Sequence, residues 1–200
     1  MQTLEDVYNY HCSMTSDINE HLPTLKKYAS GCYHVTEFGV RWVCSTYGLM
    51  SGIPKKLTSY DINNVEPIKL EMLYRLAEDN CIDFKFIKAD VLNREIEQTD
   101  LLFIDTLHGY KQLKLELALH SHKVNSYIIF HDTVSYAYHD EGQPNPDTLN
   151  GNMRHLFDSL PPRQGLLAAI HEFLQANKDW QMEKHCTNNN GLMILKRNHA

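Results

Sequence analysis

The hydrophobic and polar positions of the chain follow two alternating periods. Short apolar or alternating runs predict strands. The runs 101–105 and 127–132 are continuously apolar until they end in polar residues, as in strands buried on both faces of a parallel sheet. Between the runs, apolar residues recur roughly every three to four positions, as in amphipathic helices. The predicted strands are 33–40, 56–61, 83–88, 101–105, 127–132, 180–185 and 191–196. The predicted helices are 16–29, 45–52, 66–79, 110–121, 153–160 and 164–177.

Strands that alternate with helices predict an α/β fold, here a Rossmann-like, doubly wound and mostly parallel sheet. The last two strands are separated by residues 187–191, an Asn-rich turn that predicts a closing antiparallel hairpin. We expect one domain over residues 1–200, with an N-terminal helical segment at 1–30 and the Rossmann-like core at 31–200. The Gly- and Pro-containing stretch 134–152 predicts a polar loop that serves as a lid.

Two details inside these segments affect the expected structure. Ser16 and Asp17 are good N-cap residues for the first helix, but Pro23 lies within it, so that the helix begins or bends there. His120 and His122 are two positions apart at a predicted helix end and are expected at the surface.

The composition is that of a soluble globular protein. The chain has 200 residues, of which 42% are hydrophobic and 22% charged, and its formal net charge is −6. An acidic balance argues against a nucleic-acid partner, which needs a basic face. No apolar run approaches the ~18 residues needed to cross a bilayer, so no membrane partner is expected. The five cysteines are scattered without a C-x-x-C pair, which predicts reduced thiols and a cytoplasmic location.

Acidic residues stand at or just beyond the ends of four predicted strands. They are Asp61, Asp90, Asp105 and Asp132. In open parallel sheets, ligands bind outside the carboxyl ends of the strands, near the point where the strand order reverses. Acids at strand ends are common by chance in α/β proteins, and Asp105 could simply cap the next helix. The ordered set predicts a binding site at this edge of the sheet.

Asp105 and Asp132 can share one cation if their strands are neighbours. Adjacent strands lie ~4.8 Å apart, and Mg²⁺ takes carboxylate oxygens at ~2.1 Å. Without a cation, the two carboxylates would repel each other and one would retain a proton. The spacing of adjacent strands is thus compatible with one Mg²⁺ ion shared by these two residues.

The first strand is followed by a turn with a single glycine, Gly39. Glycine permits a tight turn and the close approach of a ligand. There is no G-x-G-x-x-G fingerprint, because Arg41 and Val43 occupy positions where glycines are expected. Ser45 is suited to cap the next helix. Taken alone, this pattern is equally typical of an ordinary strand-to-helix turn.

Taken in order, these segments resemble class I S-adenosylmethionine-dependent methyltransferases over about residues 16–197. Within that family, they are most similar to the cephalosporin-hydroxylase-like and macrolide-sugar O-methyltransferase group, and more distantly to catechol O-methyltransferase. The segments that carry the resemblance are Glu37–Arg41, Leu57–Asp61, Ile87–Asp90, Asp100–His108 and His131–Thr133.

The resemblance implies contacts with S-adenosylmethionine. Glu37 and Gly39 are expected beside its methionine part, and Ser45 is a further expected contact. Asp61 is expected to accept hydrogen bonds from the ribose hydroxyls, and Asp90 to lie near the adenine.

The resemblance also implies a metal site and a base. Asp105 and Asp132 match the positions that hold a divalent cation, and His131 or Thr133 is expected to add a ligand. Asp105 is expected to border the cofactor as well. His108, three residues beyond Asp105, matches a general base.

These expectations predict a Mg²⁺-assisted O-methyltransferase that acts on a small hydroxylated molecule, such as a sugar or a catechol. Three alternatives stay open. One is a non-catalytic protein of the same fold that binds an adenosine cofactor. Another is an NAD-type oxidoreductase, which the missing glycine fingerprint disfavours. The third is a metal-dependent hydrolase that uses His131 and Asp132. The sequence is compatible with a homo-oligomer.

Overall fold

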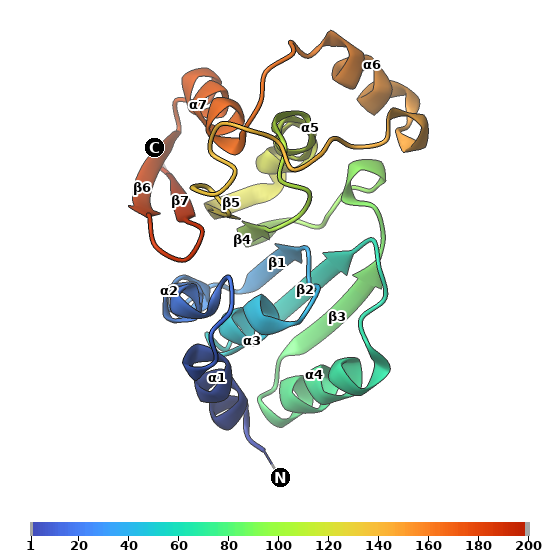
Figure 1. The fold of residues 1–200 in the computed structure, drawn as a ribbon. Helices are drawn as coiled ribbons and strands as arrows, with labels where there is room; N and C mark the ends of the chain where they lie inside the picture. Colours follow the sequence, from blue (N-terminus) through green and yellow to red (C-terminus); the bar gives the residue numbers. More distant parts are fainter. Residues whose placement is uncertain (1, 199–200) are drawn as a thin grey trace.

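The computed structural model of the protein describes residues 2–198. In this range, seven strands form one sheet with the order β3-β2-β1-β4-β5-β7-β6 (Figure 1). The sheet is parallel from β3 to β5, and β7 pairs antiparallel with both β5 and β6. The strands are β1 (His34–Phe38), β2 (Lys56–Asp61), β3 (Asp83–Lys88), β4 (Thr99–Ile104), β5 (Val124–His131), β6 (Trp180–Cys186) and β7 (Leu192–Arg197). The predicted fold class is confirmed, including the closing hairpin.

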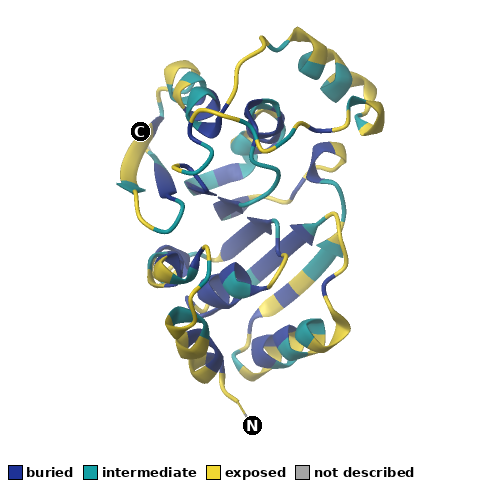
Figure 2. Cartoon of the chain, viewed as in Figure 1, coloured by how far each residue is buried: buried dark blue, intermediate teal, exposed yellow. Residues whose placement is uncertain are grey.

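Helices cover both faces of the sheet. The helices are α1 (Leu4–Ser13), α2 (Leu22–Ala29), α3 (Cys44–Met50), α4 (Pro67–Asp79), α5 (Tyr110–His120), α6 (Gly151–Ser159) and α7 (Leu166–Ala176), with short 3₁₀ turns η1 (Asn19–His21), η2 (Val91–Asn93), η3 (Ser121–Lys123) and η4 (Pro146–Thr148). Helices α1 to α4 pack into one apolar core, and α5 and α7 pack into the other. The central strands between the two cores are almost wholly buried (Figure 2).

Strand β4 shows why its apolar run is continuous. Leu101 and Phe103 belong to the core under α1–α4, whereas Leu102 and Ile104 belong to the core under α5 and α7. Successive side chains of a strand point to opposite faces, so a strand covered on both faces needs an apolar residue at every position.

The first predicted helix is shorter than the pattern indicates. The helix α2 begins at Leu22, with Pro23 in its first turn, rather than at residue 16. Proline lacks an amide proton and is tolerated only at a helix start. The residues before it form a separate turn, in which the Asn19 amide donates to Ser16 Oγ at 3.0 Å. The side chain of Ser16 competes there with helical hydrogen bonding.

Other differences between prediction and structure are smaller. The helix α6 begins at Gly151, inside the stretch that was predicted to be loop, because Asn150 Oδ1 accepts a hydrogen bond from the Met153 amide and caps it. His120 is fully buried, not exposed, and its Nε2 bonds to the Val91 carbonyl oxygen. Across residues 2–198, no helix has the length and apolar character that a membrane span requires.

Candidate active site at the carboxyl edge of the sheet

A cavity of ≈ 610 Å³ opens at the carboxyl ends of the first four strands. The strand order reverses between β1 and β4, so this is the switch point at which α/β sheets bind ligands. Four of the residues predicted to contact the cofactor line the cavity, namely Gly39, Asp61, Asp90 and Asp105. The predicted lid loop contributes Gln143, Pro144, Asn145 and Thr148.

Gly39 permits the close approach of two chain segments at the cavity. Its φ is +83°, and a Cβ atom placed on it would lie 1.9 Å from the carbonyl oxygen of Asp105. Arg41 and Val43 also have positive φ values, 40° and 64°. The turn therefore takes a conformation that favours glycine at the two positions where the expected glycines are missing. A left-handed residue other than glycine costs roughly 1–2 kcal/mol.

Asp61 holds this turn in place. Its Oδ2 accepts hydrogen bonds from the amides of Val40 and Arg41 at 2.8 and 3.1 Å, and its Oδ1 accepts one from Asn63 at 2.7 Å. Asp90 caps the turn η2, where its Oδ1 accepts from the Leu92 amide at 2.9 Å. Both carboxylates line the cavity, and their predicted ribose and adenine contacts remain predictions.

Glu37 and Ser45 are absent from the cavity lining of the described chain and bond to each other. Glu37 is fully buried and accepts hydrogen bonds from the hydroxyls of Ser45, Thr46 and Ser59 at 2.6, 2.9 and 2.6 Å. Burial raises the pKa of Glu37 to about 7, against the opposing effect of the three hydroxyls. The structure thus gives Glu37 and Ser45 a place that ties β1 to α3 and β2, rather than a place on the cavity wall.

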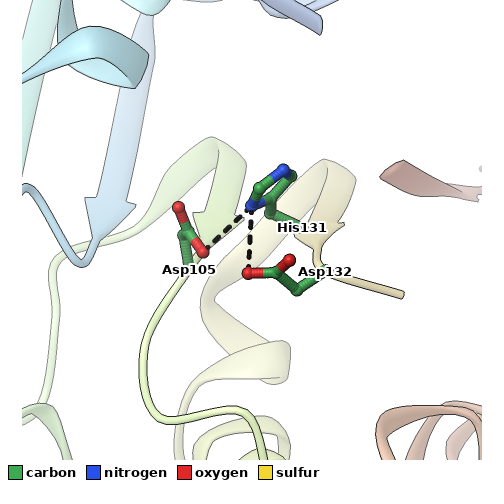
Figure 3. A group of neighbouring side chains, drawn as sticks. All are labelled: Asp105, His131 and Asp132. Atoms are coloured by element: carbon green, nitrogen blue, oxygen red, sulfur yellow. Dashed lines mark hydrogen bonds and ion pairs between the residues drawn. The ribbon is translucent and has the colours of Figure 1, made fainter. Parts of the chain in front are cut away.

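The predicted metal residues do meet. Asp105 follows β4, His131 ends β5 and Asp132 comes next, so the neighbouring strands bring the three side chains together (Figure 3). One ligand atom from each lies within 4.8 Å of the others. His131 Nδ1 is 3.2 Å from Asp105 Oδ1 and 3.4 Å from Asp132 Oδ2. Within residues 2–198, the buried Asp132 Oδ1 finds no hydrogen-bond partner.

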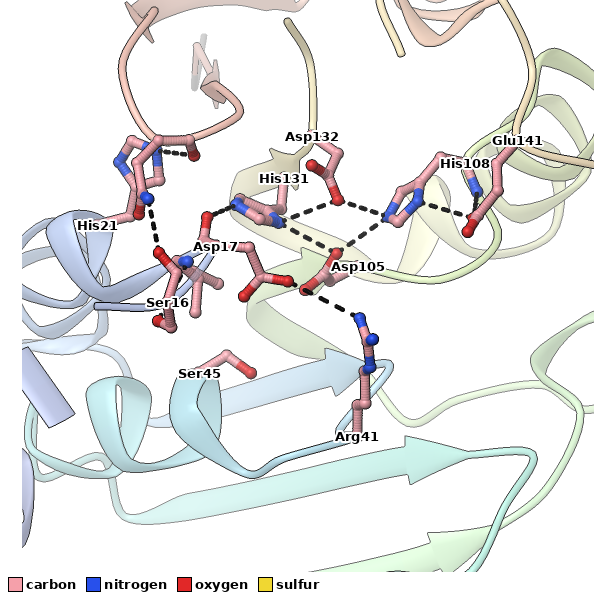
Figure 4. A network of polar contacts seen from close by, with 12 residues as sticks. Ser16, Asp17, His21, Arg41, Ser45, Asp105, His108, His131, Asp132 and Glu141 are labelled. Atoms are coloured by element: carbon pink, nitrogen blue, oxygen red, sulfur yellow. Dashed lines mark hydrogen bonds and ion pairs between the residues drawn. The ribbon is translucent and has the colours of Figure 1, made fainter. Parts of the chain in front are cut away.

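His108 lies inside this group rather than beside it. Its Nε2 is 3.1 Å from Asp105 Oδ1 and 3.0 Å from Asp132 Oδ2, and its Nδ1 is 2.9 Å from Glu141 Oε2 (Figure 4). The ring also stacks on Tyr136, with centroids 4.8 Å apart. Both ring nitrogens of His108 face carboxylates in this arrangement. Its assignment as general base remains a prediction.

The side chains of Asp105, His108, His131 and Asp132 form a charged group in which histidines and aspartates pair with each other. Burial lowers the pKa values of His108 and His131, but the hydrogen bonds to Asp105 and Asp132 outweigh burial and raise both to about 10. Asp105 is half-buried and Asp132 is buried, which raises their pKa values, yet the histidines hold both pKa values below the usual range. The hydrogen bonds between the histidines and the aspartates thus favour the charged form of each group.

Two partners of this set were not identified from the sequence. Glu141 belongs to the long polar loop, and Asp17 stands where the sequence predicts a helix cap. The carbonyl oxygen of Asp17 accepts a hydrogen bond from His131 Nε2 at 3.0 Å, and its carboxylate lies 3.7 Å from Arg41 Nη1. No spacing along the chain connects these residues to positions 108 and 131, so no local signal could have identified them.

Glu116 of α5 is a buried carboxyl near the site and leads to a testable pH dependence. It is buried, and its Oε1 accepts hydrogen bonds from Thr106 Oγ1 and Gln112 Nε2 at 2.6 and 2.7 Å. Burial raises its pKa from 4.5 to about 7. Protonated Glu116 therefore stabilises the fold below pH 4.5, and this contribution is lost as the pH rises through about 7.

We expect Glu116→Gln to gain stability relative to the parent protein as the pH rises from 5 to 8. Glutamine does not titrate, and one pKa unit corresponds to about 1.4 kcal/mol, so that the expected gain is roughly 1–3 kcal/mol. Urea unfolding at each pH measures it. The control is Glu71→Gln, because Glu71 is exposed on α4. A difference between Glu116→Gln and the parent that does not change with pH would contradict the prediction.

The chain is similar in structure to proteins of known structure. No protein-family model matches the chain. No curated protein matches it. The SAH-bound methyltransferase PaMTH1 of Podospora anserina is 14% identical, with a TM-score of 0.53 over 98% of this chain and 88% of that one. An O-methyltransferase from Bacillus cereus in complex with SAH is 13% identical, with a TM-score of 0.53 over 98% and 90%.

A third structure, the N-terminal domain of EvdMO1 in the presence of SAH and D-fucose, is 12% identical. Its TM-score is 0.52, over 94% of this chain and 85% of that one. At these identities, the likeness concerns the fold alone. The protein therefore has the fold of the class I S-adenosylmethionine-dependent methyltransferases.

Proposed function

We propose that this protein transfers a methyl group from S-adenosylmethionine to an oxygen atom of a small hydroxylated molecule. One observation carries the proposal. Asp105 belongs both to the lining of the cavity and to the charged group that it forms with His108, His131 and Asp132. A cofactor in the cavity and an acceptor at the charged group would therefore meet at Asp105.

The cavity suits a nucleoside cofactor. Its volume of ≈ 610 Å³ lies within the roughly 300–1,000 Å³ of ordinary ligand pockets. Gly39 keeps its floor free of a side chain. Asp61 and Asp90 end neighbouring strands on its wall, where ionised oxygens can accept hydrogen bonds from ribose hydroxyls and from an adenine amino group. Trp42 is 60% exposed and offers an aromatic face at the cavity.

Methyl transfer requires the protein mainly to align the acceptor oxygen with the methyl group of the cofactor. S-adenosylmethionine, when bound, supplies a methyl group that its sulfonium already makes electrophilic. The residues of the chain have to hold the acceptor oxygen in line and exclude water. Asp105 can accept a hydrogen bond from the acceptor hydroxyl, and Gln143 to Asn145 of the long loop close the cavity on one side. This loop acts as a lid in the proposal.

The acceptor is expected to be a sugar or a catechol-like molecule. The net charge of −6 disfavours a nucleic-acid acceptor, which needs a basic surface. Tyr136, stacked on His108, offers a ring on which the flat face of either acceptor could pack. The presence of D-fucose with the structurally similar EvdMO1 domain supports the sugar.

Magnesium, the predicted metal, fits the charged group poorly. Mg²⁺ takes oxygen ligands in a near-ideal octahedral shell and retains several waters. Here, imidazole nitrogens of His108 and His131 stand between the two carboxylates. No step of the proposed transfer depends on Mg²⁺.

Cofactor binding tests the proposal directly. We expect S-adenosylhomocysteine to bind and to raise the thermal unfolding temperature by mass action. Asp61→Ala should weaken this binding by about 10- to 100-fold, because a hydrogen bond to a charged acceptor contributes roughly 1.5–3 kcal/mol. Isothermal titration calorimetry measures both. Asp83→Ala is the matched control, since Asp83 is exposed at the opposite end of β3.

Several outcomes would contradict this reading. Unchanged affinity in Asp61→Ala would remove Asp61 from the cofactor site. Binding of NADH without binding of S-adenosylhomocysteine would favour an oxidoreductase. Tight cofactor binding with no transfer to any of a panel of sugars and catechols would favour a non-catalytic binding protein.

A further inference from the structure

The part of the long loop that lines the cavity, residues 143–150, has few attachments to the rest of the chain. We call these residues the lid segment, and four of them contribute to the cavity wall. Most hydrogen bonds of the lid segment stay within residues 140–158, such as the bond from the Asp147 amide to Asn145 Oδ1 at 3.0 Å. Within residues 2–198, the hydrogen bonds that leave this stretch all go to one residue, Asn93.

Asn93 is joined to the lid segment by both ends of its side-chain amide. Its Nδ2 donates to the Thr148 carbonyl oxygen at 2.9 Å, and its Oδ1 accepts from the Asn150 amide at 3.1 Å. The same Nδ2 also donates to Asp90 Oδ2 at 2.9 Å. A side-chain amide nitrogen carries two hydrogens, so that it can serve both oxygens at once. Asn93 therefore connects a carboxylate of the cavity to the segment that closes the cavity on one side.

The turn η2 that ends in Asn93 is fixed to the body of the protein, whereas the lid segment is not. Val91 and Leu92 of this turn are buried, and the Val91 carbonyl oxygen bonds to Nε2 of the buried His120 at 2.8 Å. Every residue of the lid segment except Pro144 is exposed or half-buried. Segments with few buried contacts open at a low cost in free energy. The bonds to Asn93 therefore decide where the lid segment lies.

We propose that Asn93 is a positioning residue that couples ligand binding at Asp90 to closure of the lid segment. A hydrogen-bond donor of a ligand in the cavity holds the Asp90 carboxylate in the orientation that accepts from Asn93. Because the lid segment supplies part of the cavity wall, a ligand gains those contacts only when the segment is closed. Each event therefore stabilises the other. The inference rests on the proposed function in one respect, since the ligand is taken to be S-adenosylmethionine or its product.

Hydrogen exchange of the lid segment in the unliganded full-length protein tests the connection first. Asn93 is exposed, so that its variants should fold normally. Asn93→Ala should speed exchange at the Asn150 amide by about 10-fold, the scale of a lost hydrogen bond. Asp90→Asn keeps an oxygen to cap η2 but places a donor against Asn93 Nδ2, and it should speed the same exchange by about 3-fold.

The double variant and a control complete this comparison. The variant with both Asn93→Ala and Asp90→Asn should exchange like Asn93→Ala alone, because the two changes break the same chain of contacts. Asn152→Ala, at an exposed position in the first turn of α6, should exchange like the parent protein.

Saturation with S-adenosylhomocysteine tests the coupling itself. The ligand should slow exchange of the lid segment by about 10-fold in the parent protein and leave it nearly unchanged in saturated Asn93→Ala. Asn93→Ala should also raise the dissociation rate constant of the ligand by about 10-fold, with a smaller change in the association rate constant, because an open lid segment releases the ligand sooner. If Asn93 only supported the local structure, the ligand would still protect the lid segment in the variant.

Three results would overturn the inference. They are parent-like exchange of the lid segment in unliganded Asn93→Ala, additive effects in the double variant, and protection by the ligand that persists in Asn93→Ala. Failure of S-adenosylhomocysteine to bind the parent protein would contradict the proposed function instead. The comparison of the unliganded variants would then still decide whether Asn93 connects Asp90 to the lid segment.

Discussion

Gly39→Ala is expected to abolish detectable binding of S-adenosylhomocysteine and to lower the free energy of unfolding by at least about 2 kcal/mol. The added methyl group would lie 1.9 Å from the Asp105 carbonyl oxygen, and the backbone at position 39 has a φ of +83°. The contact is with backbone, so no flexible side chain can move to relieve it. The turn and the chain after β4 would have to separate, which would alter two walls of the cavity.

Calorimetry and urea unfolding on the same preparation measure the two effects. Gly151→Ala is the matched control, because a Cβ at that position meets no atom within 4 Å and lies in the first turn of α6. The control should bind S-adenosylhomocysteine like the parent protein. A Gly39→Ala variant with parent-like affinity would show that the glycine turn does not shape the cofactor cavity.

Asp132→Asn is expected to reduce methyl transfer by about 10²- to 10³-fold, the scale at which active sites lose rate when one charge-stabilising contact is removed. Asp132 Oδ2 is the partner of both His108 and His131, at 3.0 and 3.4 Å, and a neutral amide replaces that charge poorly. Asparagine tolerates the left-handed φ of 58° at this position, so the backbone should persist. Affinity for S-adenosylhomocysteine should stay within about two-fold of the parent, since Asp132 is absent from the cavity lining of the described chain.

The measurement is formation of S-adenosylhomocysteine from S-adenosylmethionine, with a monosaccharide and a catechol panel as acceptors. Asp79→Asn, at an exposed position near the end of α4, serves as the control and should transfer at the parent rate. Parent-like transfer by Asp132→Asn would place the reaction away from the charged group. Reduced transfer together with lost cofactor affinity would indicate damage to the fold rather than to the chemistry.

Local sequence pattern was sufficient for most of the elements and for their layering. The continuous run at 101–105 predicts a strand covered on both faces, and Leu101 and Leu102 indeed enter opposite cores. Asparagines before Gly191 predict the closing hairpin. These features are encoded in neighbouring residues, because side-chain alternation, turn chemistry and helical spacing all act over a few positions.

The acids at the strand ends were also predictable as a set. Parallel strands end at one edge, so Asp61, Asp90, Asp105 and Asp132 had to gather there once the sheet was parallel. The conformation of the turn after β1 was less predictable from the sequence. The missing glycines at positions 41 and 43 weaken a motif, yet both residues adopt the left-handed backbone. The surrounding structure imposes that conformation, and no residue preference reveals it.

Only the tertiary structure decided how these acids are used. Glu37 bonds to Ser45, Thr46 and Ser59 instead of facing the cavity, because α3 and the neighbouring strand β2 bring these hydroxyls to its carboxylate. His108 enters the charged group because the loop after β4 folds back over β5, where Glu141 holds its outer nitrogen.

His131 is oriented by the carbonyl oxygen of Asp17, which lies 114 positions away along the chain. Every residue has a backbone carbonyl, so the sequence does not indicate which carbonyl accepts the hydrogen bond. The sequence alone determined that acids and histidines would meet at one edge of the sheet. The packing of distant loops decided which nitrogen of each histidine faces them, because that choice depends on hydrogen-bond partners that only the folded chain brings within reach.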